Sequence, residues 1–254
     1  MSESDQRKFA NTLNEHVSGC AAAHQRLRSS LENLTDNQCR EDSRLPNWSR
    51  GHVLTHLARN ADSHVNLLQA AVRGEVGEQY ASVEKRNGDI ESGSTRSAEE
   101  LVMDLRLSIY GLEAAWASAN EKAWQGQGRN LSGRVIEMSS LVFLRWREVE
   151  IHHADLNLGF GYNDLTPLYV RLELDQQIML WRSRKPMGMT EIPEIAKKLS
   201  PSQRLAWLMG RVEVEGLAKP EPLRESFLDS VLSLRLLLAP ALRGRRPWLT
   251  PMLD

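Results

Sequence analysis

Hydrophobic residues recur every three or four positions in four long segments of the chain, which is the spacing of amphipathic helices. The first segment covers residues 5–34, the second lies between Ser49 and Gly74, the third follows Ser97, and the fourth covers residues 133–158. Serine is a favourable N-cap and glycine a common C-terminal stop, which supports these boundaries. Four such helices with one long connection are typical of a four-helix bundle.

Two glycine-rich connections separate the predicted helices. They cover residues 74–96 and 118–134, and we expect both to be loops. A connection as long as the first is uncommon within a compact domain unless it is functional or disordered.

The pattern changes after residue 160. A threonine N-cap followed by proline begins a predicted helix over residues 166–184, and another helix is expected over residues 200–210. The alternating segment 211–215 predicts a short strand. We therefore expect a mainly α chain in three parts: a bundle over residues 1–160, a small α/β domain over residues 161–222 and a helical extension over residues 223–254.

Composition and charge narrow the class of protein. The chain has 254 residues, of which 41% are hydrophobic and 26% charged, with a net charge of −1. These values exclude a disordered, highly charged chain and give no electrostatic case for nucleic-acid binding. No apolar run approaches the roughly 18 residues that span a bilayer, and the first residues are polar, so we expect a cytoplasmic protein with no membrane partner.

The cysteines are expected to be thiols. Cys20 lies on the apolar face of the first predicted helix and is expected to pack in the protein core. A homo-oligomer is compatible with the sequence.

Histidines and a glutamate on two of the predicted helices are candidates for metal binding. His52 and His56 share one face of the second helix, and Glu148 and His152 share one face of the fourth. Two imidazole nitrogens and one carboxylate oxygen would leave the fourth position of zinc open, and the same set also suits Fe(II). Spacing alone favours a structural interpretation, since such pairs are frequent by chance and an inward histidine is commonly a hydrogen-bonded core residue.

Four motifs resemble those of a known family. Residues 45–61 (LPNWSRGHVLTHLARNA) resemble the second-helix signature of the mycothiol-dependent maleylpyruvate isomerase family, which belongs to the DinB-like metal-binding superfamily. Residues 145–156 (RWREVEIHHADL) resemble its fourth-helix signature, Arg86 with the residues after it resembles the loop between them, and residues 205–211 (LAWLMGR) resemble a C-terminal element. The matches keep their order and cover approximately residues 5–222, so together they are specific.

The resemblance implies a DinB-like four-helix bundle followed by a small α/β domain. The zinc ligands of the family fall on His56, Glu148 and His152, although another divalent metal would also suit these residues. His52 matches a neighbouring histidine that is not counted among the ligands. The chain departs from the family pattern before residue 200, where it is short, and after residue 222, where no counterpart is recognised.

The resemblance also implies two active-site arginines, Arg86 and Arg211. Arginine binds carboxylates bidentately, so Arg86 from the long loop and Arg211 from the second domain are expected to clamp a dianionic substrate between them. Asp155 either orients the imidazole of His152 or is a surface acid at the helix end. His52 either hydrogen-bonds a bound thiol or water, or is a structural residue at the edge of the bundle.

The function implied is that of a zinc- and thiol-dependent cis–trans isomerase. A low-molecular-weight thiol such as mycothiol would add to a maleylpyruvate-like enone, the bond would rotate, and elimination would give the trans product. One alternative is a zinc-dependent thiol S-transferase acting on electrophiles. Another is a non-catalytic metal-binding bundle that binds a partner through residues 223–254.

Overall fold

The computed structural model of the protein describes residues 2–185 and 190–220. Residues up to Pro220 form one compact unit. The helical extension expected over residues 223–254 lies outside the described residues. The domain boundary expected at residue 160 stays a prediction.

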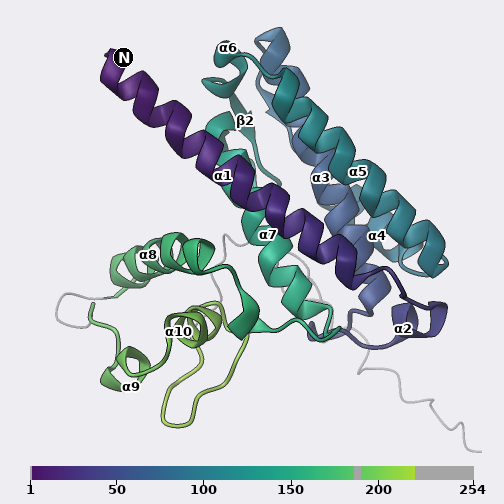
Figure 1. Ribbon diagram of the computed structural model, residues 1–254, viewed down its shortest axis with the longest axis vertical. Helices are drawn as coiled ribbons and strands as arrows, with labels where there is room; N and C mark the ends of the chain where they lie inside the picture. The colour runs from purple at the N-terminus through teal and green to yellow at the C-terminus, as the bar shows by residue number, and fades with distance from the viewer. Residues whose placement is uncertain (1, 186–189, 221–254) are drawn as a thin grey trace, which may run out of the picture. The chain divides into compact units, whose positions relative to one another are not determined.

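Four long helices run side by side in the first part of the chain (Figure 1). Helix α3 packs against α5 and α7, and α1 packs against α7 and α5. The expected mainly α class and four-helix bundle are confirmed. The four helices are α1 (Glu3–Ser30), α3 (Arg50–Arg73), α5 (Ala98–Ser118) and α7 (Leu141–Asp155).

The ends of α3 and α5 follow the caps expected from the sequence. The side chain of Ser49 accepts a hydrogen bond from the amide of His52, and that of Ser97 accepts one from the amide of Glu100. Gly74 ends α3 with φ of 80°, a left-handed conformation that favours glycine. These contacts satisfy amides and carbonyls that a helix end leaves without partners.

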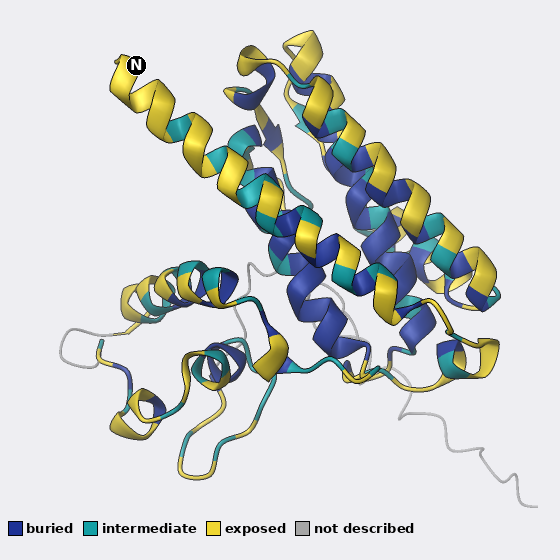
Figure 2. Ribbon diagram, viewed as in Figure 1, coloured by how far each residue is buried: buried dark blue, intermediate teal, exposed yellow. Residues whose placement is uncertain are grey.

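The core of the bundle surrounds α3 and α7, which are dark blue in Figure 2. In α7 only Leu144 and Arg147 are not buried. Helix α1 approaches α7 closely because Gly19 has no side chain: a Cβ atom there would lie 2.2 Å from the ring of Trp146. Cys20, the next residue, is fully buried, as expected.

The two connections contain short elements where loops were expected. In the first lie β1 (Gly77–Glu78) and α4 (Val83–Gly93), and the second holds α6 (Glu121–Trp124) and β2 (Gln127–Arg129). Strand β2 pairs in parallel with β1 and antiparallel with β3 (Val135–Glu137).

The expected start of the fourth helix near residue 133 is wrong. Residues 135–137 form β3, and α7 begins only at Leu141, after a 3-10 turn, η1 (Met138–Ser140). Val135 and Ile136 are β-branched and favour the strand, for which β2 supplies a hydrogen-bonding partner. A further short helix, α2 (Asp36–Arg40), precedes α3.

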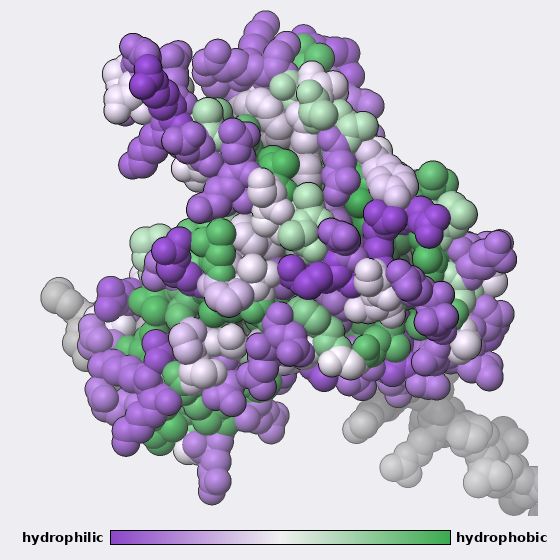
Figure 3. Space-filling model, viewed as in Figure 1, coloured by the Kyte–Doolittle hydropathy of each residue, from purple (hydrophilic) through white to green (hydrophobic). Residues whose placement is uncertain are grey.

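The described residues after the bundle are helical. Helices α8 and α10 pack together, and hydrophobic surface shows among hydrophilic side chains over them in Figure 3. The strand expected over residues 211–215 is not formed, since within the described ranges this segment has no strand to pair with. The elements are η2 (Tyr162–Asp164), α8 (Pro167–Ser183), α9 (Glu194–Lys197) and α10 (Pro201–Leu208).

Among the described residues, none of the helices is long and apolar enough to cross a membrane.

Candidate metal centre

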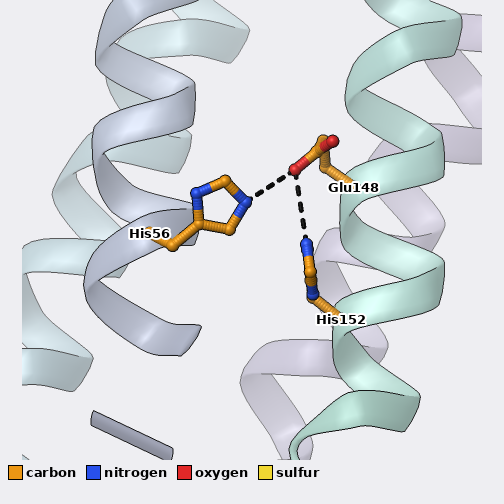
Figure 4. Close-up of side chains that lie close together, drawn as sticks. All are labelled: His56, Glu148 and His152. Atoms are coloured by element: carbon orange, nitrogen blue, oxygen red, sulfur yellow. Dashed lines mark hydrogen bonds and ion pairs between the residues drawn. The ribbon is translucent and has the colours of Figure 1, made fainter. Parts of the chain in front are cut away.

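His56, Glu148 and His152 meet between α3 and α7 (Figure 4). The Nε2 atom of His56 lies 2.7 Å from Oε2 of Glu148, and Nε2 of His152 lies 3.5 Å from the same oxygen. One ligand atom from each of the three residues lies within 4.8 Å of the others. All three side chains are buried. The structure therefore brings together the three residues that the resemblance assigns as ligands.

The helices account for this convergence. Glu148 and His152 are four residues apart on α7, so their side chains project from one face. His56 lies two turns into α3 and faces them, with the ring of Trp48 centred 5.6 Å from its own ring. The three groups are thus held by regular backbone and a packed aromatic side chain.

The protonation of the cluster depends on burial and on its internal contacts. Burial lowers the pKa of His56 to about 4, although Glu148 opposes the shift. Burial alone would raise the pKa of Glu148, but hydrogen bonds and charges from His152 and His56 outweigh it and hold that pKa well below its usual value. Burial alone would lower the pKa of His152, but hydrogen bonds and charges from Asp155 and Glu148 outweigh it and raise that pKa. Metal binding would displace the protons held in these contacts, because metal ligands must be deprotonated.

The donor set fits a divalent metal. Within the described part of the chain, Glu148 has hydrogen bonds and ion pairs only with the two histidines, and no lysine or arginine forms an ion pair with it. Imidazole nitrogen can lose its proton to a metal, whereas a guanidinium donor cannot. When the two imidazoles give up these protons and bind a metal, the carboxylate of Glu148 can therefore bind it as well.

Asp155 lies behind His152 and is fully buried, which excludes a surface acid. Its Oδ2 atom lies 2.9 Å from Nδ1 of His152. Its other oxygen accepts a hydrogen bond of 2.6 Å from the hydroxyl of Tyr162 and lies 3.2 Å from Nε of Arg211. These contacts favour the interpretation in which Asp155 orients the imidazole, as carboxylates behind metal-bound histidines commonly do.

The two predicted arginines contact different residues of the site: Arg86 contacts His56, and Arg211 contacts Asp155 behind His152. Arg86 is buried and lies on α4 instead of the loop expected there; its Nη2 atom is 3.1 Å from Nδ1 of His56. The longer first connection has room for an 11-residue helix capped by Ser82, which explains the difference. Arg211 follows α10 and contacts Asp155. Their joint clamping of a substrate stays a prediction.

The other histidines have structural contacts. His52 caps α3 through Ser49, and its Nε2 atom lies 3.4 Å from Glu91, which favours the structural interpretation. His153 is buried with its ring stacked on Phe160, and His64 is buried further along α3.

The sequence interpretation missed a second buried polar group on the same helices. Asn60 and His64 follow His56 at intervals of four residues on α3, and Arg145 precedes Glu148 by three on α7. All are buried, and Nη1 of Arg145 donates to Oδ1 of Asn60 at 2.8 Å. The signal was available: polar residues recur every fourth position on a face that should be apolar.

Comparison with known proteins shows the family of the chain. The family model described as "Mycothiol maleylpyruvate isomerase N-terminal domain" matches residues 20–157, more than half of the chain. The chain belongs to this family. Two solved structures, a mycothiol-dependent maleylpyruvate isomerase and a histidine-to-alanine mutant of that enzyme, are similar to it. Each has a TM-score of 0.74 and 24% identity, over 83% of this chain and 97% of the other, and at this identity the likeness shows the fold. No curated protein sequence matches the chain.

Proposed function

We propose that the protein is a zinc- and thiol-dependent cis–trans isomerase of maleylpyruvate-like enones. Family membership makes the chain an enzyme. The observation that carries the proposal is the buried convergence of His56, Glu148 and His152. Two solved structures with this fold are named as a mycothiol-dependent maleylpyruvate isomerase, which supports mycothiol as the thiol.

The three ligands would hold zinc with one position open. Zinc needs four ligands, and two imidazoles with one carboxylate are typical of catalytic sites. When bound, the metal keeps a coordinated thiol in its anionic form at neutral pH. Asp155, from behind His152, would keep the Nε2 atom of that imidazole directed at the metal.

The thiol must come from outside the chain. Cys20 and Cys39 are both buried. Burial raises the pKa of the Cys20 thiol far above its usual value and that of Cys39 to about 11. A thiol, as opposed to a thiolate, is a poor nucleophile, so neither residue supplies the attacking sulfur.

The arginines would bind the electrophile. Addition of the thiolate to the double bond places negative charge on the neighbouring carbonyl oxygen, the resulting single bond rotates, and expulsion of the thiolate restores a trans double bond. Nε of Arg86 and Nη2 of Arg211 are buried and have no hydrogen-bond partner among the residues described. Donors fixed in this way stabilise carboxylate and enolate oxygens without reorganisation.

The test is a thiol panel with the zinc-loaded protein. We expect maleylpyruvate to be converted to fumarylpyruvate only when a suitable thiol is present. The conversion is measured by ultraviolet absorbance. His56→Ala is the matched control, since it should abolish conversion in every mixture. Conjugation of thiol to electrophiles without isomerisation would instead indicate an S-transferase, and the absence of both reactions with every thiol would refute the proposal.

A further inference from the structure

Arg145 is a buried cation whose hydrogen bonds go to neutral groups. It is fully buried on α7. Nη1 donates to the carbonyl oxygen of Leu57 and to Oδ1 of Asn60, both at 2.8 Å, and Nε donates to Nε2 of His24 at 3.1 Å. No carboxylate forms an ion pair with it in the part of the chain described here. A buried charge is costly unless an opposite charge compensates it.

A structural role explains only part of this arrangement. His24 links Arg145 to Glu113: its Nε2 atom accepts from Arg145, and its Nδ1 atom lies 2.9 Å from Oε1 of Glu113. Arg145 thereby joins α1, α3 and α7. Its Nη2 atom, however, takes no part in these bonds and has no partner among the described residues.

Two further buried nitrogen atoms near Arg145 have no partner either. The amide nitrogen Nδ2 of Asn60 and Nδ1 of His64 are buried without a hydrogen bond in the described ranges. Because Asn60 accepts from Arg145 through its oxygen, its free NH2 group lies next to the guanidinium. His64 follows one turn later on the same face of α3. Buried polar groups are normally satisfied, so the free donors of Arg145 and Asn60, joined by Nδ1 of His64 in the tautomer that carries its proton there, indicate a missing acceptor.

We propose that Arg145, Asn60 and His64 form an anion subsite beside the metal centre that takes a carboxylate group of the substrate. The inference rests on the proposed function for the identity of the anion. Planar guanidinium and amide groups match the two oxygens of a carboxylate. Arg145 is three residues from Glu148 on α7, so the subsite lies within one helical turn of a metal ligand.

The charges near the cluster agree with this assignment. The guanidinium groups of Arg86, Arg145 and Arg211 and a divalent metal together exceed the carboxylates of Glu148 and Asp155 by three positive charges. A dicarboxylate and a thiolate carry three negative charges between them. Binding of both reactants would thus offset the excess positive charge of these groups.

The experiment measures binding of maleate, a cis-dicarboxylate, to the zinc-loaded full-length protein by calorimetry without thiol. Arg145→Gln is unsuitable alone, because it would break the contacts to α1 and α3 and could prevent folding. Asn60→Asp keeps an acceptor for Arg145 but removes the free NH2 group and adds a negative charge. We expect maleate to bind this variant at least tenfold more weakly, with unchanged zinc content.

Asn157→Asp is the matched control. The side-chain oxygen of Asn157 also accepts from an arginine, Arg44, but at the surface. This variant should bind maleate like the wild type. Equal maleate affinity in folded Asn60→Asp, or no binding by the wild type, would overturn the subsite. Loss of maleate binding in Asn60→Asp together with an inactive wild type would support the subsite and refute the isomerase function alone.

Discussion

Two buried glutamates on α7, two residues apart, belong to very different environments. Glu148 faces α3 and contacts two imidazoles. Glu150, on another side of the helix, accepts hydrogen bonds from Arg26 at 2.7 Å and from the indole of Trp146 at 3.0 Å, and it also contacts Thr166. Both carboxylates are buried, but only Glu150 has permanent donors.

The comparison shows that partner chemistry, more than burial, separates a metal ligand from a structural acid. Arginine side chains cannot be deprotonated in proteins, and Arg26 occupies the carboxylate of Glu150 through its guanidinium group. The imidazoles around Glu148 can release theirs, which leaves three donor atoms for a metal. Two adjacent histidines differ similarly: His152 lies between two carboxylates, whereas His153 stacks on Phe160 and contacts Ser30.

The largest expected effect is loss of metal when a ligand is replaced. Glu148→Gln or His56→Ala should remove nearly all bound zinc, because two protein ligands do not hold the ion. Glu150→Gln should retain full zinc content while unfolding about 1–3 kcal/mol more easily, since it weakens a buried charge-assisted hydrogen bond. Metal analysis and denaturant unfolding measure both; equal zinc content in all three variants would remove the distinction.

A smaller loss of metal is expected behind His152. Asp155→Asn should weaken zinc binding by roughly 10–100-fold, the usual effect of removing a carboxylate that orients a metal-bound imidazole. Tyr162→Phe, which removes one hydrogen bond to the same carboxylate, should cause a smaller loss. Competition with a chromogenic chelator gives the affinities. Wild-type affinity in Asp155→Asn would show that the contact has no role at the metal.

The free energy of unfolding of the metal-free protein should decrease as the pH is lowered. Burial lowers the pKa of His56 and of His153 to about 4, that of His24 also to about 4 and that of His64 to about 3. Their unfolded forms, with a pKa near 6.5, bind protons first, so between pH 6.5 and 4 stability should fall by up to about 1.4 kcal/mol per pH unit for each histidine.

His152 should act in the opposite sense. Its raised pKa means that protonation stabilises the fold below pH 6.5, and this contribution is lost as the pH rises through the folded value. Urea unfolding at pH 7.5 and 5.5 tests both signs. His153→Asn should reduce the acid sensitivity, whereas His152→Asn should increase it; the reverse order would contradict the account.

The smallest effect concerns Arg86. Its N–H donates to Nδ1 of His56 and so favours the proton on Nε2, the atom that a metal needs. Arg86→Ala should therefore bind zinc up to about fivefold more tightly, as expected for one net hydrogen bond of about 1 kcal/mol, while turnover falls. Chelator competition and kinetics separate the two effects. Tenfold weaker zinc binding would show that Arg86 supports the metal.

The sequence indicated the bundle well because helix signals are local. Capping residues such as Ser49 and Ser97 and the hydrophobic period are legible without tertiary contacts. Residues 135–137 were misassigned because their strand depends on β2, and residues 211–215 because an alternating pattern forms no strand without a neighbour. Both errors concern strand pairing, which the pattern within one segment does not decide.

For the site, the sequence predicted which residues approach one another but not which charges and hydrogen bonds surround each of them. His56, Glu148 and His152 could be named from helical spacing and the family resemblance. Spacing could not show that Asp155 is buried behind His152 or that Arg86 lies on a helix. Arg145 was overlooked because an arginine within an amphipathic helix ordinarily faces solvent.

The most direct test of the central claim, a buried metal with an open position for a thiol, is a cobalt(II) titration followed by absorbance. We expect one cobalt ion per chain and, on addition of mycothiol, a new thiolate-to-cobalt charge-transfer band in the near ultraviolet. His56→Ala should show neither signal, and Glu150→Gln should show both. A cobalt spectrum that mycothiol leaves unchanged, or one that survives in His56→Ala, would contradict the account.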